Sequence, residues 1–244
     1  MKKVEYSKVV FDVVSALNAV NNSVAFDKEE DAGGTKNVFV KSTSFDKSIA
    51  YILKCPEELF NFDGDSCSFY DFKSFYSLFG LLDEPEIEED DDNVNIKLIK
   101  NNQSISYRLT DREMIKKEFN AVDLDNHDSE FEVSDGMIKY MRQVIGNPAI
   151  SADRVKFNFT KDKLEYTIYN EKGSNKFVDD IECKTTDDGK EDFKFVIPTD
   201  TILKLPVASY KVKAYESGIL KFSMVREDDI VVDVYVSSMD DEEE

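Results

Sequence analysis

The sequence predicts an α+β protein that is dominated by antiparallel sheet and assembled from two copies of one unit. Along its 244 residues, short runs of alternating apolar and polar residues recur between turn residues, as antiparallel strands require. Four stretches instead repeat apolar residues at three- and four-residue steps, the spacing of one helix face. These stretches fall into two pairs at one offset of about 128 residues, and a fixed internal period indicates a duplication.

The clearest helix pattern lies in residues 68–87. Its large apolar side chains share one stripe of a helix, and they are Phe72, Phe75, Tyr76, Phe79 and Leu82. The opposite face is small and weakly basic, with Lys73, Ser77 and Gly80. Asp71 can cap the first turn, and Pro85 stops the helix. The aromatic stripe is therefore expected to pack inward and the weakly basic face to point outward.

The partner of this helix in the second copy is a short helix within residues 198–210. It follows the strand-like run 193–197 and presents Ile202, Leu203 and Leu205, with Lys204 pointing outward. Residues 6–20 and 133–146 form the other pair of amphipathic helices. The duplication predicts two domains, residues 1–125 and residues 126–244, with the boundary in the polar connector 110–128.

The remaining alternating runs predict the strands of each copy. In the first copy they are residues 37–45 and 48–54, followed by a hairpin of 93–99 and 104–109. In the second copy they are residues 155–160, 164–170, 177–185 and 192–197, followed by a meander of 208–216, 219–226 and 229–237. Two helices and about eight strands per copy indicate a sheet-dominated α+β fold.

Charge and cysteine usage limit the possible surroundings of the chain. It carries 51 acidic and 31 basic residues, a net charge of −20, with acidic runs at 83–92 and 240–244. This charge should repel nucleic acid from the outer surface. Cys55, Cys67 and Cys183 lack paired spacing and suit reduced thiols. With neither a signal peptide nor a membrane span in the sequence, we expect a soluble, cytoplasmic protein without membrane contact.

Catalytic chemistry is missing from the sequence. The single histidine, His127, lies in a polar connector, where we expect a solvated side chain and not a general base. Residues 64–68 do not form a nucleophile elbow, and residues 32–37 lack the spacing of a phosphate-binding loop. The cysteines and one histidine cannot assemble a metal site. We therefore expect a protein that is not an enzyme and that needs neither a metal nor a cofactor.

Three segments of the chain resemble the sliding clamps of T-even-type bacteriophages. Residues 68–98 resemble the first-domain helix, acidic loop and strand of those clamps. Residues 130–170 resemble the opening of their second domain, and residues 205–237 resemble their final strands. The segments occur in the same order and cover about half of the chain. Residues 25–45, the longer connector and the acidic tail depart from the pattern, and the tail resembles that of the eukaryotic clamps.

The resemblance implies duplicated DNA-clamp domains with sheets outside and helices lining a ring. It also implies a homotrimer that encircles duplex DNA, is loaded by an ATP-driven clamp loader and tethers the replicative DNA polymerase for processive synthesis. If the protein is viral, it acts in the cytoplasm of an infected bacterial cell. Two domains per chain need three chains for a six-domain ring, and heterologous interfaces that close give such rings. Pairing of edge strands between subunits would also remove exposed sheet edges.

The clamp interpretation assigns roles to two sets of residues. The cations expected to face DNA are Lys8, Lys73, Lys139, Arg142 and Lys204. They would contact phosphates without sequence preference, and the alternative for them is an ordinary solvated helix face. The residues expected to form a pocket for partner peptides are Leu205, Pro206 and Tyr235, and the alternative for them is the plain hydrophobic core.

A second function remains open from the sequence alone. An acidic interaction protein, such as a DNA mimic that occupies a basic DNA-binding surface, would share the high negative charge and the lack of catalytic residues. The duplication and the outward cations favour the clamp. Oligomeric state separates the two functions, because only the clamp must close a ring.

Overall fold

The computed structural model describes residues 2–30, 33–90, 94–115, 124, 126–160, 163–186 and 192–239. The chain divides into two compact units. Unit 1 holds Met1–Ser44, Tyr51–Asn120 and Arg226–Val232, and unit 2 holds Phe45–Ala50, Ala121–Val225 and Asp233–Glu244. Asp125, the last residue of the expected first domain, lies outside the described residues, as does the acidic tail from Asp240 onward.

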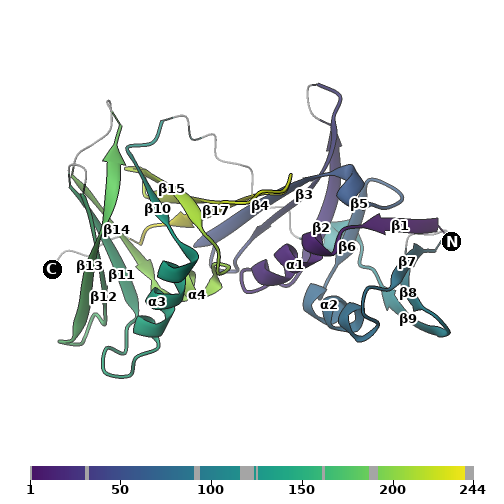
Figure 1. Cartoon of the computed structure of the whole chain (residues 1–244), viewed down its shortest axis with the longest axis horizontal. Helices are drawn as coiled ribbons and strands as arrows, with labels where there is room; N and C mark the ends of the chain where they lie inside the picture. Colours follow the sequence, from purple (N-terminus) through teal and green to yellow (C-terminus); the bar gives the residue numbers. More distant parts are fainter. Residues whose placement is uncertain are drawn as a thin grey trace. The chain divides into compact units, whose positions relative to one another are not determined.

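Unit 1 combines two short helices with antiparallel strands (Figure 1). Its strands are β1 (Lys2–Tyr6), β2 (Val24–Glu30), β3 (Lys36–Thr43), β4 (Ile49–Pro56), β5 (Phe60–Asn61), β6 (Ser66–Phe69), β7 (Glu86–Glu89), β8 (Asn95–Lys100) and β9 (Gln103–Arg108). Its helices are α1 (Lys8–Leu17), α2 (Phe72–Leu81) and the 3₁₀ turns η1 (Glu57–Leu59) and η2 (Arg112–Met114). One sheet has the order β5-β1-β7-β8-β9, and β4-β3-β2-β6 are neighbours in another.

The core of unit 1 is built from aromatic rings. Phe11 on α1 is fully buried, and its ring centroid lies within 6.3 Å of six other rings. These rings belong to Tyr6, Phe26, Phe60, Phe72, Phe75 and Phe79. Most of the pairs are edge-to-face, the arrangement that the ring quadrupoles favour. Phe72, Phe75 and Phe79 of the stripe predicted for α2 therefore face inward and pack against α1, whereas Tyr76 of the same predicted stripe is only half-buried.

Unit 2 repeats this plan with the remaining elements. Its strands are β10 (Ser129–Val133), β11 (Arg154–Thr160), β12 (Lys163–Tyr169), β13 (Lys176–Thr185), β14 (Phe193–Pro198), β15 (Tyr210–Tyr215), β16 (Ile219–Met224) and β17 (Val231–Ser237). They follow the order β14-β11-β12-β13-β10-β15-β16-β17, and the pairs within this series are antiparallel. The helices α3 (Asp135–Ile145) and α4 (Thr199–Lys204) contact one another, as Figure 1 shows.

The core of unit 2 is mainly aliphatic where its helices meet the strands. The buried residues of α3 are Ile138, Met141, Val144 and Ile145, and those of α4 are Thr199, Thr201 and Ile202. None of them is aromatic, and the buried rings of this unit come from strands, as does the stacked pair Phe159 and Phe193 at 4.4 Å. The two units therefore share an architecture but fill their helix–sheet interfaces differently.

The structure confirms the α+β class with mainly antiparallel sheet, and it confirms the repeat of the helices. Helix α1 begins at position 8 and α3 at 135, whereas α2 begins at 72 and α4 at 199, which is 127 residues in both cases. The expected helix boundaries were too wide. Residues 68–87 contain the end of β6, the ten residues of α2 and the start of β7, because Asp83 and Glu84 take up positive φ angles of 49° and 59° and leave the helix.

Six strands of the described residues were not predicted from the sequence: β1, β2, β5, β6, β7 and β10. Strand β7 lies in the acidic run 83–92, whose charge favours an exposed loop. It forms because Ile87 and Glu89 alternate inward with exposed Glu86 and half-buried Glu88. Glu89 is the exception to the charge pattern, because it is 1% exposed and accepts a hydrogen bond of 2.6 Å from the Asp63 backbone N–H.

Candidate DNA-facing helices and partner surface

In unit 1, the outward face of α1 carries an acid–base pair. Lys8 and Asp12 are four residues apart and therefore on one face of the helix. The Lys8 Nζ lies 3.7 Å from Asp12 Oδ2, and both side chains are about half exposed. The Tyr76 hydroxyl on α2 donates a hydrogen bond to the other carboxylate oxygen of Asp12. Asp12 therefore links the two helices of this unit on their solvent side.

Lys73 stands apart from this pair on α2. The helix begins after Asp71, whose side chain accepts a hydrogen bond of 2.9 Å from the Ser74 backbone N–H, as the sequence predicted. Lys73 is exposed and forms no ion pair with the part of the chain that the structure describes. Ser77 and Gly80 are both exposed, and a Cβ atom added at Gly80 would meet no atom within 4 Å. The small, weakly basic face of α2 is thus open to solvent.

In unit 2, α3 repeats the acid–base pair with its polarity reversed. Its first turn is capped by Ser134, whose hydroxyl accepts a hydrogen bond of 3.1 Å from the Met137 backbone N–H. Lys139 Nζ lies 2.9 Å from Asp135 Oδ2, and the hydrogen bond from this ammonium group lowers the pKa of Asp135. Both side chains are more than half exposed.

Arg142 points along the same helix face but is held by the fold. Its Nε donates to the Ile202 carbonyl at 3.4 Å, and its Nη2 donates to the carbonyls of Leu203, at 2.9 Å, and Leu205. These acceptors lie at the C-terminal end of α4, where helix carbonyls lack partners within the helix and attract cations. Arg142 therefore joins α3 to α4. Its contact with DNA stays a prediction, and what the structure shows is that it connects two helices by hydrogen bonds.

Lys204 is the last residue of α4 and pairs with Asp200 at its first turn. The Lys204 Nζ lies 2.6 Å from Asp200 Oδ2, with exposed fractions of 21% for the lysine side chain and 64% for the aspartate. The structure thus places all five predicted cations on helices or at helix ends, two in unit 1 and three in unit 2. It leaves their role toward DNA as a prediction.

The residues predicted for a partner pocket are enclosed. Leu205 is fully buried, and Pro206 is buried with its carbonyl accepting a 2.7 Å hydrogen bond from the Tyr210 hydroxyl. What this segment presents to solvent is its apolar neighbours Leu203 and Val207, which are 44% and 41% exposed. A peptide that docks here would therefore meet Leu203 and Val207 first, and the pocket role of Leu205 and Pro206 stays a prediction.

Tyr235 on β17 is 9% exposed and lies beside a cation. Lys221 Nζ is 5.5 Å from the centroid of the Tyr235 ring and 2.8 Å from Asp233 Oδ2. Burial raises the pKa of the Tyr235 hydroxyl, and the charge of Lys221 opposes that shift. Tyr235 is thus held by a cation–π contact at the border between the core and the surface.

An exposed aromatic residue of unit 2 was not predicted as part of the partner surface. Phe45 lies in the turn between β3 and β4 and is fully exposed. The backbone N–H of Ser237, two residues after Tyr235, donates a 3.0 Å hydrogen bond to the Ser48 carbonyl, so this turn lies beside the end of β17. Met239 is 38% exposed just beyond. A large aromatic side chain within the polar turn SFDKS was the available signal, since such turns normally carry small polar residues.

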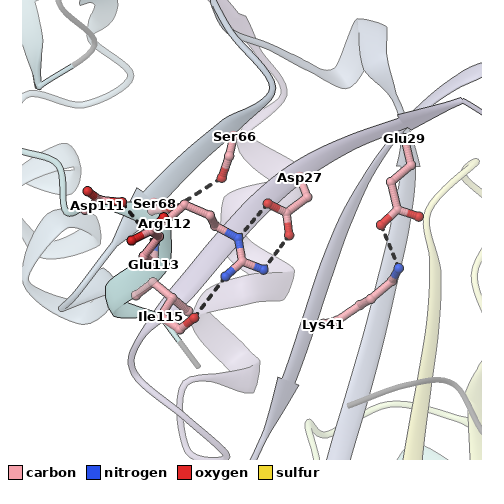
Figure 2. A network of polar contacts seen from close by, with 9 residues as sticks. All are labelled: Asp27, Glu29, Lys41, Ser66, Ser68, Asp111, Arg112, Glu113 and Ile115. Carbon is pink, nitrogen blue, oxygen red and sulfur yellow. Dashed lines mark hydrogen bonds and ion pairs between the residues drawn. The ribbon is translucent and has the colours of Figure 1, made fainter. Parts of the chain in front are cut away.

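A polar network in unit 1 fixes the chain that leaves β9, as Figure 2 shows. The Arg112 guanidinium donates to both carboxylate oxygens of Asp27 at 2.7 Å and to the Ile115 carbonyl at 3.0 Å. Asp111 caps the 3₁₀ turn η2 by accepting from the Glu113 backbone N–H. Nearby, the hydroxyls of Ser66 and Ser68 on β6 hydrogen-bond each other. The Thr110 backbone N–H donates to the Ser68 carbonyl. Within the connector predicted for residues 110–128, the described part thus forms the short 3₁₀ turn η2, and residues 116–119 lie outside the described residues.

Groups that could support catalysis do not come together in the described residues. No group of three or more His, Cys, Asp or Glu residues there could hold a metal ion. Burial raises the pKa of the Cys55 thiol to about 12 and that of Cys67 well above its ordinary value, which keeps both thiols protonated. His127 is less solvated than expected, because it packs against Tyr215 with Nε2 3.5 Å from Glu130 Oε2. No helix in the described residues is long and apolar enough to cross a membrane.

No protein-family model and no curated protein sequence matches the chain. Solved structures match it over nearly its whole length. A PCNA of A. fulgidus, solved with the C-terminal region of FEN-1 bound, has 12% identity and a TM-score of 0.74 over 99% of both chains. The Proliferating Cellular Nuclear Antigen of Entamoeba histolytica has 13% identity and a TM-score of 0.71 over 98% of both chains.

A third match is the PCNA2–PCNA3 complex of Sulfolobus tokodaii, with 11% identity and a TM-score of 0.69 over 98% of this chain and 99% of that one. This chain therefore has the fold of the PCNA-type sliding clamps, which confirms the predicted fold class. The closer resemblance to T-even-type bacteriophage clamps stays a prediction.

Proposed function

We propose that this protein is a sliding clamp, a ring of three copies that encircles duplex DNA and tethers the replicative DNA polymerase during processive synthesis. The observation that carries this proposal is the full-length clamp fold, with its two helix pairs repeated at one spacing. An ATP-driven clamp loader would open and close the ring. The protein itself supplies geometry and charge, and no reaction.

The outward helix faces supply the DNA-facing surface in this proposal. Lys8, Lys73, Lys139 and Lys204 present ammonium groups on them, with Arg142 beside α4. Ammonium groups attract phosphates without reading base sequence. A net charge of −20 does not prevent this, because salt confines the field of a surface charge to about 8 Å at physiological ionic strength.

Ring closure would use two open strand edges, the first of them on β9. Strand β9 pairs only with β8 among the described strands. The Leu109 backbone N–H donates to the Val94 carbonyl, so odd-numbered residues of β9 bond β8 and even-numbered ones point their backbone groups outward. Ser104, Ser106 and Arg108 therefore carry the open edge.

The complementary edge lies on β13 in unit 2. Residues 176–182 of β13 pair with β12, whereas only residues 183–185 pair with β10, which leaves the second edge of 176–182 open among the described strands. This edge carries Asp179, Asp180 and Glu182, the opposite sign from Arg108. Strand addition from β9 of one copy to β13 of the next would cover both edges.

Partners would dock by short peptides on the apolar surface of unit 2. Phe45, Leu203 and Val207 are among the exposed apolar side chains of this unit, and Tyr235 adds a ring that is 9% exposed. One of the similar structures carries the C-terminal region of FEN-1 on a PCNA, and we propose the same class of partner, a peptide tail, for this chain. Aromatic anchors commonly dominate such contacts.

The experiment that tests the ring replaces Ser106 by proline. Proline removes one outward N–H from β9 and leaves every β8–β9 hydrogen bond in place, since proline is tolerated on an edge strand. Ser106→Thr is the matched control. We expect Ser106→Pro to sediment as a folded monomer and to lose stimulation of the polymerase, with Ser106→Thr unchanged. A Ser106→Pro protein that remains a trimer would remove β9 from the interface.

A further inference from the structure

The same side-chain pair occurs on three of the four α-helices that the structure describes. In each case a lysine and an aspartate lie four residues apart on the outward face: Lys8 with Asp12 on α1, Lys139 with Asp135 on α3, and Lys204 with Asp200 on α4. The distances are 3.7, 2.9 and 2.6 Å. Each of these lysines thus has a carboxylate beside its ammonium group.

Helix stability explains two of these pairs but not the third. Asp135 and Asp200 lie in the first turns of α3 and α4, where a negative charge favours the helix dipole. In α1 the order is reversed, with Lys8 in the first turn, where a positive charge is unfavourable, and the lysine-first orientation is the weaker one. The pair on α1 therefore needs a reason other than the helix itself.

Asp12 is also held in place from the neighbouring helix. The Tyr76 hydroxyl donates to Asp12 Oδ1, while Lys8 approaches Oδ2. A solvated carboxylate would rotate freely on the helix, but these two contacts keep the Asp12 carboxylate on the outward face next to the lysine. The contact comes from α2, so the pair is a feature of the tertiary structure and not only of one helix.

Resting on the proposed function, we propose that Asp12, Asp135 and Asp200 act as internal competitors of the DNA phosphates. Each carboxylate occupies the lysine that a phosphate would otherwise bind, so that a phosphate contact must replace an existing ion pair. Arg142 is occupied by carbonyls, which leaves Lys73 as the one predicted cation without such a partner among the described residues. The helix faces therefore hold DNA by many weak, exchangeable contacts, as movement along the duplex requires.

The test replaces the three aspartates together, as Asp12→Asn, Asp135→Asn and Asp200→Asn. Asparagine keeps the shape and the hydrogen-bond acceptor and removes the charge. The measured quantities are the affinity for a short linear duplex at several salt concentrations and the diffusion rate of the clamp on long DNA. We expect affinity to rise about tenfold or more at low salt, and the slope of log K against log salt to steepen by about 0.9 for each lysine that gains a phosphate. Diffusion along DNA should slow.

The matched control removes three negative charges elsewhere, as Glu58→Gln, Glu132→Gln and Glu165→Gln, which are exposed residues outside the four α-helices. If the control tightens DNA binding as much as the aspartate variant, net charge alone is the cause and the proposal is wrong. An aspartate variant with unchanged affinity and slope would also overturn it. The single variant Asp12→Asn repeats the test where no helix-dipole contribution is lost, in case the triple variant does not fold.

The wild-type protein separates this proposal from the proposed function. On a linear duplex whose ends are blocked after binding, a ring is trapped whatever the strength of its phosphate contacts. If wild type is trapped and the aspartate variant binds no more tightly, only the competitor role fails. If neither protein is trapped, the sliding-clamp function fails as well.

Discussion

The helix pairs of the two units repeat at the same spacing in the chain but differ in the residues that join them. In unit 1, α1 and α2 meet through a cluster of rings around Phe11, and their solvent side is joined by the Tyr76–Asp12 hydrogen bond. In unit 2, α3 and α4 bury no aromatic residue, and Arg142 joins them by donating to carbonyls at the end of α4. Each pair is thus held by apolar packing on its inner side and by a polar link on its outer side.

This difference teaches that the duplication preserves where the helices lie and not how they are held. The spacing of 127 residues is identical for both pairs, although no side chain that joins α1 to α2 has a counterpart of the same type between α3 and α4. A two-helix layer over antiparallel strands needs only an inward apolar face and one link on the outward side, and different residues satisfy both needs. The four predictions below test this comparison.

The largest effect should come from Phe11→Ala. Phe11 is fully buried and contacts six rings, so the substitution leaves a large cavity in the core of unit 1. We expect the free energy of unfolding to fall by about 3 to 5 kcal/mol. Urea unfolding followed by circular dichroism measures this loss. A loss below about 1 kcal/mol would show that the aromatic cluster is not the centre of unit 1.

The polar link of unit 2 should matter less, but it should be specific to the guanidinium. Arg142→Met keeps much of the apolar stem and leaves the carbonyls at the end of α4 without their donor, at a cost of about 1 to 3 kcal/mol. Arg142→Lys should restore little, since one ammonium group cannot reproduce the forked contacts to Ile202, Leu203 and Leu205. Lys139→Met on the same face is the control and should leave thermal unfolding unchanged. If Arg142→Met and Lys139→Met lower the stability equally, the hydrogen bonds of Arg142 do not stabilise the contact between α3 and α4.

Unit 1 has a buried acid that unit 2 lacks among its described residues. Burial raises the pKa of Glu89. Because the folded state holds this proton more tightly than the unfolded state, its contribution to stability is present below the unfolded pKa and lost as pH rises through the folded pKa. Glu89→Gln removes that dependence. The free energy of unfolding of wild type, relative to that of the variant, should therefore increase toward acid pH by about 1.4 kcal/mol per unit of pKa shift. Parallel pH profiles of unfolding would contradict this.

The smallest effect should come from Tyr76→Phe, which removes the polar link of unit 1 at a partly exposed site and should cost less than about 1 kcal/mol. Burial, with the neighbouring Asp12 charge, raises the pKa of Tyr76 to about 12. The stability from this proton is present below the ordinary tyrosine pKa of about 10 and is lost as pH rises through the folded value. Ultraviolet titration curves of wild type and Tyr76→Phe should differ by one tyrosine that titrates late. If that tyrosine instead titrates near the ordinary pKa, Asp12 does not accept a hydrogen bond from the Tyr76 hydroxyl.

Period and amphipathicity predicted much of the fold. The stripe of Phe72, Phe75 and Phe79 identified α2, and the cap at Asp71 located its start within one residue. The ends were harder, because α2 ends at Leu81, four residues before Pro85, and the chain then turns to positive φ at Asp83 and Glu84. Strand β7 was hidden by its acidic sequence, since burial of Glu89 depends on the Asp63 backbone N–H, which is distant in the chain.

The candidate surfaces were less predictable than the fold. Helical spacing placed Lys139 and Arg142 on one face but could not show that Arg142 is held by carbonyls of a helix some 60 residues later. Leu205 and Pro206 stand in an apolar run that suits a pocket as well as a core, and only the fold shows that they are enclosed. Phe45 was overlooked because a single exposed ring in a turn has no periodic signal.

The most direct test of the clamp proposal asks whether DNA ends release the protein. Labelled protein is bound to linear duplex DNA at high concentration, the ends are blocked with bound streptavidin, and the sample is washed with high salt. A ring should remain on the blocked DNA, about three chains of 28.0 kDa per complex, and should leave once a restriction enzyme cuts between the blocks. Retention that is the same with free, blocked and cut ends, or no retention in any of them, would contradict the account and favour a protein that binds from the side or only mimics DNA.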